Sequence, residues 1–169
     1  MVRIRAEEPH DVAAIHALNV AAFESNAEAR LVDALRAAGA LTLSLVAQDG
    51  GEIVGHIAFS PVVVTSNETS ADGVGLAPMA VSPDRQRTGI GGQLIAQGLS
   101  RLRATNQPFC VVLGHPEYYP RHGFQRAIEF GIRWEKGGTE DFFFIQQLVP
   151  GGLNGVSGTA RYRPEFEQI

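Results

Sequence analysis

The segment Gln86-Arg87-Thr88-Gly89-Ile90-Gly91 has the residue types and spacing best suited to chemistry. It follows an apolar run that ends at Val81 and precedes apolar residues at helical spacing. A helix start offers unpaired backbone N–H groups and a partial positive charge, and glycines let backbone and ligand approach closely. Arg85 and Arg87 add positive charge, although their side chains would suit solvent equally well. We predict an anion site for a pyrophosphate, the alternative being a plain glycine turn that begins a helix.

Two other phosphate-binding loops do not fit this segment. A Walker A loop needs Gly-Lys-Ser/Thr, and the sequence contains no Gly-Lys pair. A dinucleotide-binding fingerprint would continue Gly89-x-Gly91 with glycine or alanine at the position of Leu94. A nucleotide-binding protein of either type is therefore not expected.

Helices and strands must position this loop. Apolar residues at helical spacing after Pro9 predict a first helix. Ser25 and Glu28 have the spacing of a capping box for a second helix, which we expect to end at Gly39. A third helix follows the loop, with these residues facing the core: Leu94, Ile95, Leu99 and Leu102. The residues Glu117–His122 are also expected to be helical.

The remaining apolar runs predict strands. They are Val2–Arg5, Leu41–Asp49, Ile53–Thr65, Val74–Val81, Phe109–Leu113, Phe124–Arg126, Gly131–Trp134 and Phe142–Leu148. The residues Ser66–Gly73 are expected to be a polar loop, and the glycine-rich last twenty residues are not assigned. Strands around one strand–loop–helix crossover predict an α+β fold with a mixed sheet.

The composition indicates a single globular domain over residues 1–169. The net charge of −4 is not that of a nonspecific nucleic-acid binder. The single cysteine, Cys110, excludes an intramolecular disulfide and suits the core. No apolar run approaches the roughly 18 residues of a membrane helix, and the first residues do not form a signal peptide. We expect a cytoplasmic protein.

The loop motif resembles motif A of the GCN5-related N-acetyltransferase (GNAT) superfamily, which has the pattern Gln/Arg-x-x-Gly-x-Gly/Ala. Downstream, the residues Gly114–Phe124 resemble motif B of that family, in which a tyrosine stands four residues before a Gly-Phe pair. Tyr119 occupies that place. The residues Ser44–Ala47 and Val54–Ser60 and the glycine-rich end are similar to a bacterial branch of predicted acetyltransferases. Two motifs in the right order and separation make the resemblance specific.

The resemblance implies the acyl-CoA N-acyltransferase fold, a central twisted mixed sheet with splayed strands flanked by helices. Acetyl-CoA would be the cosubstrate and would lie between the strands Leu76–Val81 and Phe109–Leu113. Met79, Ala80 and Val81 would offer backbone groups to the pantetheine arm, and the Val81 N–H would polarise the thioester carbonyl. The pyrophosphate would be wrapped by backbone groups of Arg87, Thr88, Gly89, Ile90, Gly91 and Gly92.

The resemblance also implies direct attack of an amine on the thioester, so that Cys110 is not needed as a nucleophile. A tyrosine hydroxyl is protonated at neutral pH and can protonate the departing thiolate. Tyr119 is the candidate for this role, and Tyr118 would replace it in a different helix register. The general base is left open among Glu24, Glu28, His56, His115, Glu117 and a water chain. The histidines lack metal-ligand spacing, and no metal is expected.

The expected function is therefore an N-acetyltransferase that uses acetyl-CoA and a small-molecule or protein amine. The alternative is a non-catalytic acyl-CoA-binding sensor or scaffold. Neither nucleic acid nor membrane is an expected partner. An exposed edge strand near the C-terminal end would permit a homodimer, and Phe142–Phe144 would serve either as strand core or as a dimer contact.

Overall fold

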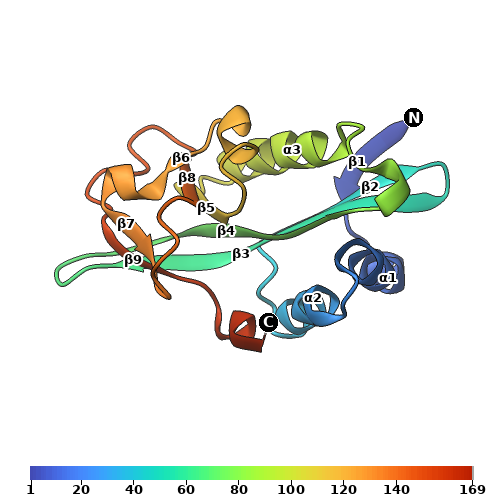
Figure 1. Ribbon diagram of the computed structural model, residues 1–169, viewed down its shortest axis with the longest axis horizontal. Coiled ribbons are helices and arrows are strands. Elements are labelled where there is room, and N and C mark those ends of the chain that lie inside the picture. The colour runs from blue at the N-terminus through green and yellow to red at the C-terminus, as the bar shows by residue number, and fades with distance from the viewer. Residues whose placement is uncertain (169) are drawn as a thin grey trace. The chain divides into compact units, whose positions relative to one another are not determined.

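The computed structural model describes residues 1–168, and its elements are shown in Figure 1. The strands are β1 (Val2–Ala6), β2 (Leu43–Asp49), β3 (Glu52–Thr65), β4 (Ser70–Val81), β5 (Phe109–Leu113), β6 (Gln125–Arg126), β7 (Ile132–Trp134), β8 (Phe143–Gln147) and β9 (Gly158–Arg161). The α-helices are α1 (Val12–Phe23), α2 (Ala27–Ala37) and α3 (Ile90–Ala104). The 3-10 helices are η1 (Pro9–Asp11), η2 (Pro83–Arg85), η3 (Tyr119–His122), η4 (Ala127–Phe130) and η5 (Pro164–Gln168).

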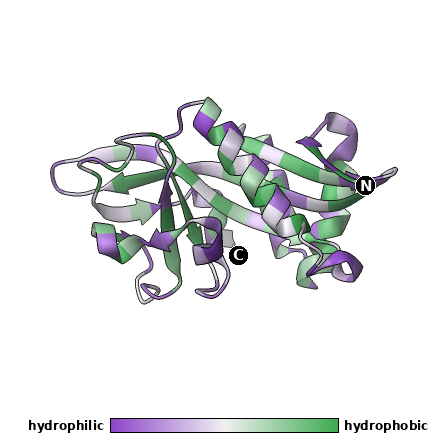
Figure 2. Ribbon diagram, turned by 90° about the horizontal axis from the view of Figure 1, so that it is seen from above, coloured by the Kyte–Doolittle hydropathy of each residue, from purple (hydrophilic) through white to green (hydrophobic). Residues whose placement is uncertain are grey.

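Within these residues the strands form one mixed sheet. The order along its main path is β1-β2-β3-β4-β5-β8-β6, and β9 adds a branch by pairing with both β3 and β7. The pair β4–β5 is parallel, as the crossover through α3 requires, whereas β5–β8 and β3–β9 are antiparallel. Hydrophobic residues run along the strands in Figure 2. The mixed α+β fold class predicted from the sequence is confirmed.

The chain divides into two units, and the first contains Met1–Ser60, Ala77–Gly98 and the end of the chain from Pro164. In this unit α1 and α2 cover one face of β2 and β3, where Ile15, Val32 and Val46 form a buried cluster. The first half of α3 covers the other face. A Cβ atom at Gly55 would lie 2.9 Å from Ile90 and 3.0 Å from Leu94, so a glycine lets α3 pack directly on β3.

The second unit contains Pro61–Leu76 and Leu99–Arg163. Its core is a cluster of buried side chains from β3, β5, β7, β8, β9 and η4. The strand β9 pairs with β3 from Val63↔Arg161 to Thr65↔Thr159 and with β7 from Ile132↔Gly158 to Trp134↔Ala160. The last strand of the chain therefore joins segments that are distant in sequence.

Most of the predicted elements are confirmed, with shifts of one to a few residues at their ends. Leu94, Ile95, Leu99 and Leu102 are buried, as expected, and Gly39 follows α2 with φ +66°. Cys110 is fully buried, which confirms its place in the core. In Phe142–Phe144, the last two residues are buried strand core, whereas Phe142 is 48% exposed.

Three predictions about the fold were wrong or incomplete. The expected loop Ser66–Gly73 is shorter, because β4 begins at Ser70. The capping box at Ser25 is absent, because α2 begins at Ala27 and Glu28 stands at its second position instead of its third. Ser25 Oγ instead accepts a hydrogen bond from the Ala27 N–H at 3.2 Å. The strand β9 lies in the glycine-rich region that the sequence left unassigned.

Candidate functional site

The predicted pyrophosphate loop joins β4 to α3 in the first unit. Arg87 and Gly89 have positive φ angles of 63° and 91°, and α3 begins at the next residue, Ile90. This backbone path brings the predicted segment Arg87–Gly92 to the first turn of α3, where N–H groups have no partner within the helix. The arrangement can bind an anion with main-chain groups alone.

Hydrogen bonds from neighbouring residues hold the loop in this shape. The Ser82 N–H donates to the carbonyl oxygen of Val54 at 2.9 Å, which ties the start of the loop to β3. Thr88 Oγ1 donates to the carbonyl oxygen of Arg85 at 2.5 Å. Gln86 Nε2 donates to the carbonyl oxygen of Val81 at 3.1 Å. The loop is therefore ordered by two of its own side chains and by one backbone bond to β3.

The two arginines of the loop differ in their contacts. The Arg85 guanidinium binds the carboxylate of Asp49 at the end of β2, and this bond lowers the pKa of Asp49. Arg87 is exposed. The sequence left open whether the Arg85 side chain contacts phosphate or solvent. The structure shows a different arrangement, an ion pair with Asp49 of β2. The positive character of the loop then depends on its main chain and on Arg87.

The hydrogen bond of Ser82 shows which way the N–H groups at the end of β4 point. Consecutive N–H groups of a strand point to opposite edges. Because the Ser82 N–H points to β3, the N–H groups of Val81 and Met79 point to the edge away from β3. Pro78, which follows a cis peptide bond, has no N–H. The predicted pantetheine segment therefore presents two N–H groups on one edge.

The ladder between β4 and β5 is short. It pairs Val74 with Cys110 and Gly75 with Val111. Past Gly75, β4 continues to Val81, and past Val111, β5 continues to Leu113, with no pairing between β4 and β5 in this part of the described chain. The two strands thus part after Gly75 and Val111, as the family resemblance predicts.

Tyr119 lies in the second unit at the start of η3. A Cβ atom at Gly114 would be 2.2 Å from Cε2 of Tyr119, so the tyrosine ring lies directly on the glycine that follows β5. Phe124 contacts the ring edge-on, with centroids 5.7 Å apart, and Phe144 lies at 6.5 Å. Burial, then Tyr118 and Cys110, raise the pKa of the Tyr119 hydroxyl. The hydroxyl is therefore protonated and neutral at physiological pH.

Tyr118 has different surroundings. It stands edge-on to Tyr119 at 5.0 Å, and the guanidinium of Arg121 lies 5.5 Å from its ring centroid. Its pKa is also raised by burial, which Arg121 partly offsets. Of the two tyrosines, Tyr119 has the ring that packs on the end of β5.

The structure separates the candidate bases. His56 is fully buried and binds Ser44 Oγ through Nε2 at 2.9 Å, while Ser44 donates to Glu7. Because the Ser44 proton goes to Glu7, His56 Nε2 carries a hydrogen and donates it to Ser44. Burial lowers the pKa of His56 to about 4. A side chain with no exposed surface and so low a pKa does not suit direct deprotonation of an ammonium group. The other candidates remain accessible: Glu24, Glu28, His115 and Glu117.

Among the described residues, one group could hold a metal ion by proximity, namely Glu8, His10 and Asp11. The carboxylate of Asp11 is already bound by Arg5, with Nη1–Oδ2 and Nη2–Oδ1 distances of 2.7 and 3.0 Å. The group is therefore a cluster of charged side chains that bind one another.

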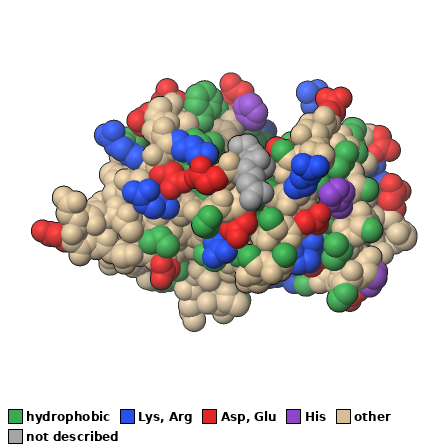
Figure 3. Space-filling model, turned by 90° about the horizontal axis from the view of Figure 1, so that it is seen from below, with side chains coloured by type: hydrophobic (Ala, Val, Ile, Leu, Met, Phe, Trp, Pro, Cys, Tyr) green, Lys and Arg blue, Asp and Glu red, His purple; other side chains and the backbone are tan. Residues whose placement is uncertain are grey.

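On the face shown in Figure 3, basic and acidic side chains lie next to one another. Among the described residues no helix is long and apolar enough to cross a membrane.

One residue near the end of the β4–β5 ladder was missed by the sequence analysis. Tyr162 follows β9, and its ring lies against Gly75. No motif marks it, because its position results from the pairing of β9 with β3. The preceding residues, Gly158–Arg161, show no strand-like alternation that could have pointed to it.

Comparison with known proteins agrees with this geometry. The sequence model of the acetyltransferase (GNAT) domain matches residues 3–127. A protein named as the uncharacterized N-acetyltransferase YhbS of Escherichia coli strain K12 is 41% identical over 167 residues, which are 98% of this chain and 99% of that protein.

Two solved structures are similar to the chain over nearly its whole length. The crystal structure of the E. coli GNAT family N-acetyltransferase YhbS in complex with CoA has a TM-score of 0.93 at 40% identity, covering 99% of this chain and 93% of the other. The structure of a GNAT family acetyltransferase from Brucella melitensis in complex with acetyl-CoA has a TM-score of 0.82 at 38% identity, covering 98% of each chain. From its motifs, its parted strands and these similarities, the chain belongs to the GNAT family of N-acetyltransferases.

Proposed function

We propose that the protein transfers the acetyl group of acetyl-CoA directly to an amine in a ternary complex of enzyme, acetyl-CoA and acceptor. The observation that carries the proposal is the ordered loop at the start of α3, which follows a strand with two N–H groups on its free edge. The complexes of its relatives with CoA and acetyl-CoA support the same cosubstrate. The enzyme is thus an acetyl-CoA-dependent N-acetyltransferase, and its single domain over residues 1–169 stays a prediction from the sequence.

In this proposal main-chain groups bind the cosubstrate. Backbone groups of Arg87, Thr88, Gly89, Ile90, Gly91 and Gly92 wrap the diphosphate. Met79, Ala80 and Val81 bind the pantetheine arm, and the N–H groups of Met79 and Val81 are the candidate donors to its carbonyl groups, including the thioester carbonyl. A donor already held in place stabilises the negative charge that develops on this oxygen, typically by about 3–4 kcal/mol.

The chemical step needs two proton movements. The neutral amine nitrogen attacks the thioester carbon, and the carbon–sulfur bond breaks as the amide bond forms. The amine loses a proton to a base or to water, and the departing thiolate takes a proton from the Tyr119 hydroxyl. Because burial raises its pKa, Tyr119 is still protonated when the thiolate forms, and the tyrosinate left behind regains a proton from solvent as the products leave. A base at the surface or a water chain fits the proposal better than His56.

The acceptor class is proposed only as an amine, from a small molecule or a protein. The loops that would contact it are variable in such folds. A cytoplasmic location and a homodimer through an edge strand stay predictions from the sequence.

The decisive experiment has two parts. Isothermal titration calorimetry with CoA and acetyl-CoA tests binding, and release of free thiol from acetyl-CoA is then measured with polyamines, amino acids, aminoglycosides and peptide N-termini. We expect binding of both ligands and amine-dependent thiol release. Binding without release on the whole panel would favour an acyl-CoA sensor, and absence of binding would contradict the proposal.

A further inference from the structure

Tyr162 closes the end of the β4–β5 ladder from one face of the sheet. A Cβ atom at Gly75 would lie 2.5 Å from Cε2 and 2.9 Å from Cζ of Tyr162, and 2.8 Å from Cγ2 of Val62. These distances are shorter than real contacts allow, so the ring edge occupies the space that a side chain at position 75 would need. Glycine is required there because the tyrosine ring approaches the backbone so closely.

Gly75 is also the last residue of β4 that pairs with β5. The hydroxyl oxygen of Tyr162 is buried, and its ring packs on the core cluster of the second unit, which includes Val62 and Val111. The hydroxyl end of this ring therefore lies at the point where the two strands part. The ring as a whole is only partly buried, and it closes this end of the opening.

Tyr119 lies at the same end of β5 but on the opposite face of the sheet. Gln146 of β8 accepts a hydrogen bond from Arg103 of α3 at 2.7 Å, which identifies the face that α3 covers. Phe144 is two residues earlier on β8 and shares that face, and Tyr119 packs near Phe144. Ile145 has the opposite orientation and belongs, with its cross-strand partner Val111, to the cluster on which Tyr162 packs.

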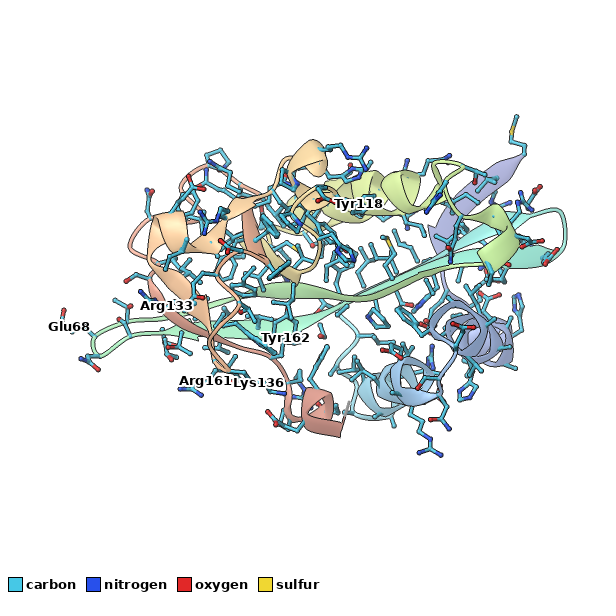
Figure 4. All side chains as sticks on the ribbon, viewed as in Figure 1. Glu68, Tyr118, Arg133, Lys136, Arg161 and Tyr162 are labelled. Atoms are coloured by element: carbon cyan, nitrogen blue, oxygen red, sulfur yellow. The ribbon has the colours of Figure 1, made fainter. Side chains whose placement is uncertain are left out.

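The figures agree with this assignment. In Figure 4, Tyr118, the neighbour of Tyr119, lies on the α3 side of the sheet, and Tyr162 lies on the other side of β4. Burial raises the pKa of the Tyr162 hydroxyl, and Cys110 and Tyr119 add to this effect. The Tyr162 hydroxyl is thus uncharged and its ring is closely packed. The sheet lies between this ring and Tyr119.

We propose that Tyr162 determines acyl-chain specificity by restricting the transferred group to about the size of acetyl. The inference rests on the proposed function, in which Tyr119 protonates the sulfur on the α3 face. An acyl chain attached to that sulfur extends into the opening between the strands, away from Tyr119. Its distal carbons would then approach the ring of Tyr162, which lies against Gly75 at the closed end of the opening. An acetyl group is short enough to avoid the contact, whereas butyryl or hexanoyl is not.

The test is calorimetric and needs no acceptor. Dissociation constants are measured for CoA, acetyl-CoA, butyryl-CoA and hexanoyl-CoA with the native protein and with the variants Tyr162→Ala and Tyr162→Phe. We expect the native protein to bind butyryl-CoA more weakly than acetyl-CoA. In Tyr162→Ala the butyryl-to-acetyl ratio should shift roughly tenfold toward butyryl-CoA, since each buried methylene changes affinity about fourfold. Tyr162→Phe keeps the ring and should keep the native ratio.

Phe130→Ala provides a matched control, because Phe130 is partly buried against the same cluster and is not among the atoms that approach Gly75. It should leave the ratio unchanged. If Tyr162→Ala does not fold, Tyr162→Leu replaces it and should show a smaller shift in the same direction. CoA itself should bind all folded variants equally.

The outcomes separate the two proposals. A ratio that stays native in the folded Tyr162→Ala or Tyr162→Leu variant, with normal CoA binding, overturns the role of Tyr162 and leaves the acetyltransferase proposal intact. The same holds if the native protein binds butyryl-CoA as tightly as acetyl-CoA. Failure of the native protein to bind either CoA or acetyl-CoA overturns the proposed function itself.

Discussion

The loop that precedes α3 and the two tyrosines at the end of the β4–β5 ladder are built in different ways. The loop presents main-chain groups, which are held by near neighbours such as Thr88 and Arg85 and by one backbone bond to β3. The tyrosines present side chains: Tyr119 packs on Gly114 and Phe124, which are close to it in sequence, whereas Tyr162 lies against the distant Gly75. The loop and Tyr119 can therefore be recognised from contiguous residues, whereas the position of Tyr162 depends on how the sheet is completed.

The largest effect should come from the tyrosine region. In Tyr119→Phe the ring contacts with Gly114 and Phe124 remain, but the proton donor is lost. We expect kcat for acetyl transfer to the best amine of the panel to fall on the order of a hundredfold. CoA affinity, measured by calorimetry, should stay within experimental error of the native value.

Tyr118→Phe is the matched control, since Tyr118 is the adjacent tyrosine and packs edge-on to Tyr119. It should retain most of the native turnover. A large loss in Tyr118→Phe with native turnover in Tyr119→Phe would exchange the roles of the two residues.

A substitution in the loop before α3 is expected to lower CoA affinity, which Tyr119→Phe leaves unchanged. Gly89 has a φ of +91°, and a Cβ atom there would meet no neighbour within 4 Å, so a substitution acts through the backbone conformation. A valine resists this conformation. Gly89→Val should weaken CoA binding by roughly twentyfold in calorimetry. It should not alter the preference between acetyl-CoA and butyryl-CoA.

Gly51→Ala is a suitable control because its added Cβ also meets nothing within 4 Å and no positive φ is involved. Native CoA affinity is expected for it. Should Gly89→Val also bind CoA normally, the loop would not be the diphosphate site.

A pH effect on stability is expected in the unit that carries the loop. His56 has a pKa of about 4 in the folded protein against 6.5 when unperturbed, because it is buried. Between these values the unfolded chain binds a proton that the native state does not, so stability falls as pH falls. Urea unfolding should give a free energy roughly 1 kcal/mol lower at about pH 5.5 than at about pH 7.

His56→Gln keeps a hydrogen-bonding group opposite Ser44 but does not titrate. The difference between the two pH values should shrink in this variant. An unchanged difference would assign the pH effect to other groups.

The smallest effect is expected for Arg85. Its guanidinium is engaged by Asp49, so it contributes little to an anion bound at the loop. Arg85→Ala should weaken CoA binding less than about threefold, as is usual for a partly exposed charge. Arg87→Ala, which removes the exposed arginine of the same loop, is the comparison variant and should have the larger effect on CoA affinity.

The sequence predicted most of the fold because its helices and long strands have clear periodicity. The end of β4 and the start of α3 were predicted because glycine spacing and an apolar strand are local signals. The strand β9 was not, since four residues after a glycine-rich stretch form a strand only when β3 and β7 are present on either side. The partner of Arg85 was also beyond prediction, because Asp49 reaches it through strand pairing.

The pairing of β3 with β9 has a consequence for how the molecule is made. Val63 can meet Arg161 only after all the residues between them have been synthesised. The edge of β3 that β9 later covers is therefore unpaired until then, and such edges tend to associate with other chains. Expression conditions that slow synthesis between β3 and β9 should lower the yield of soluble material.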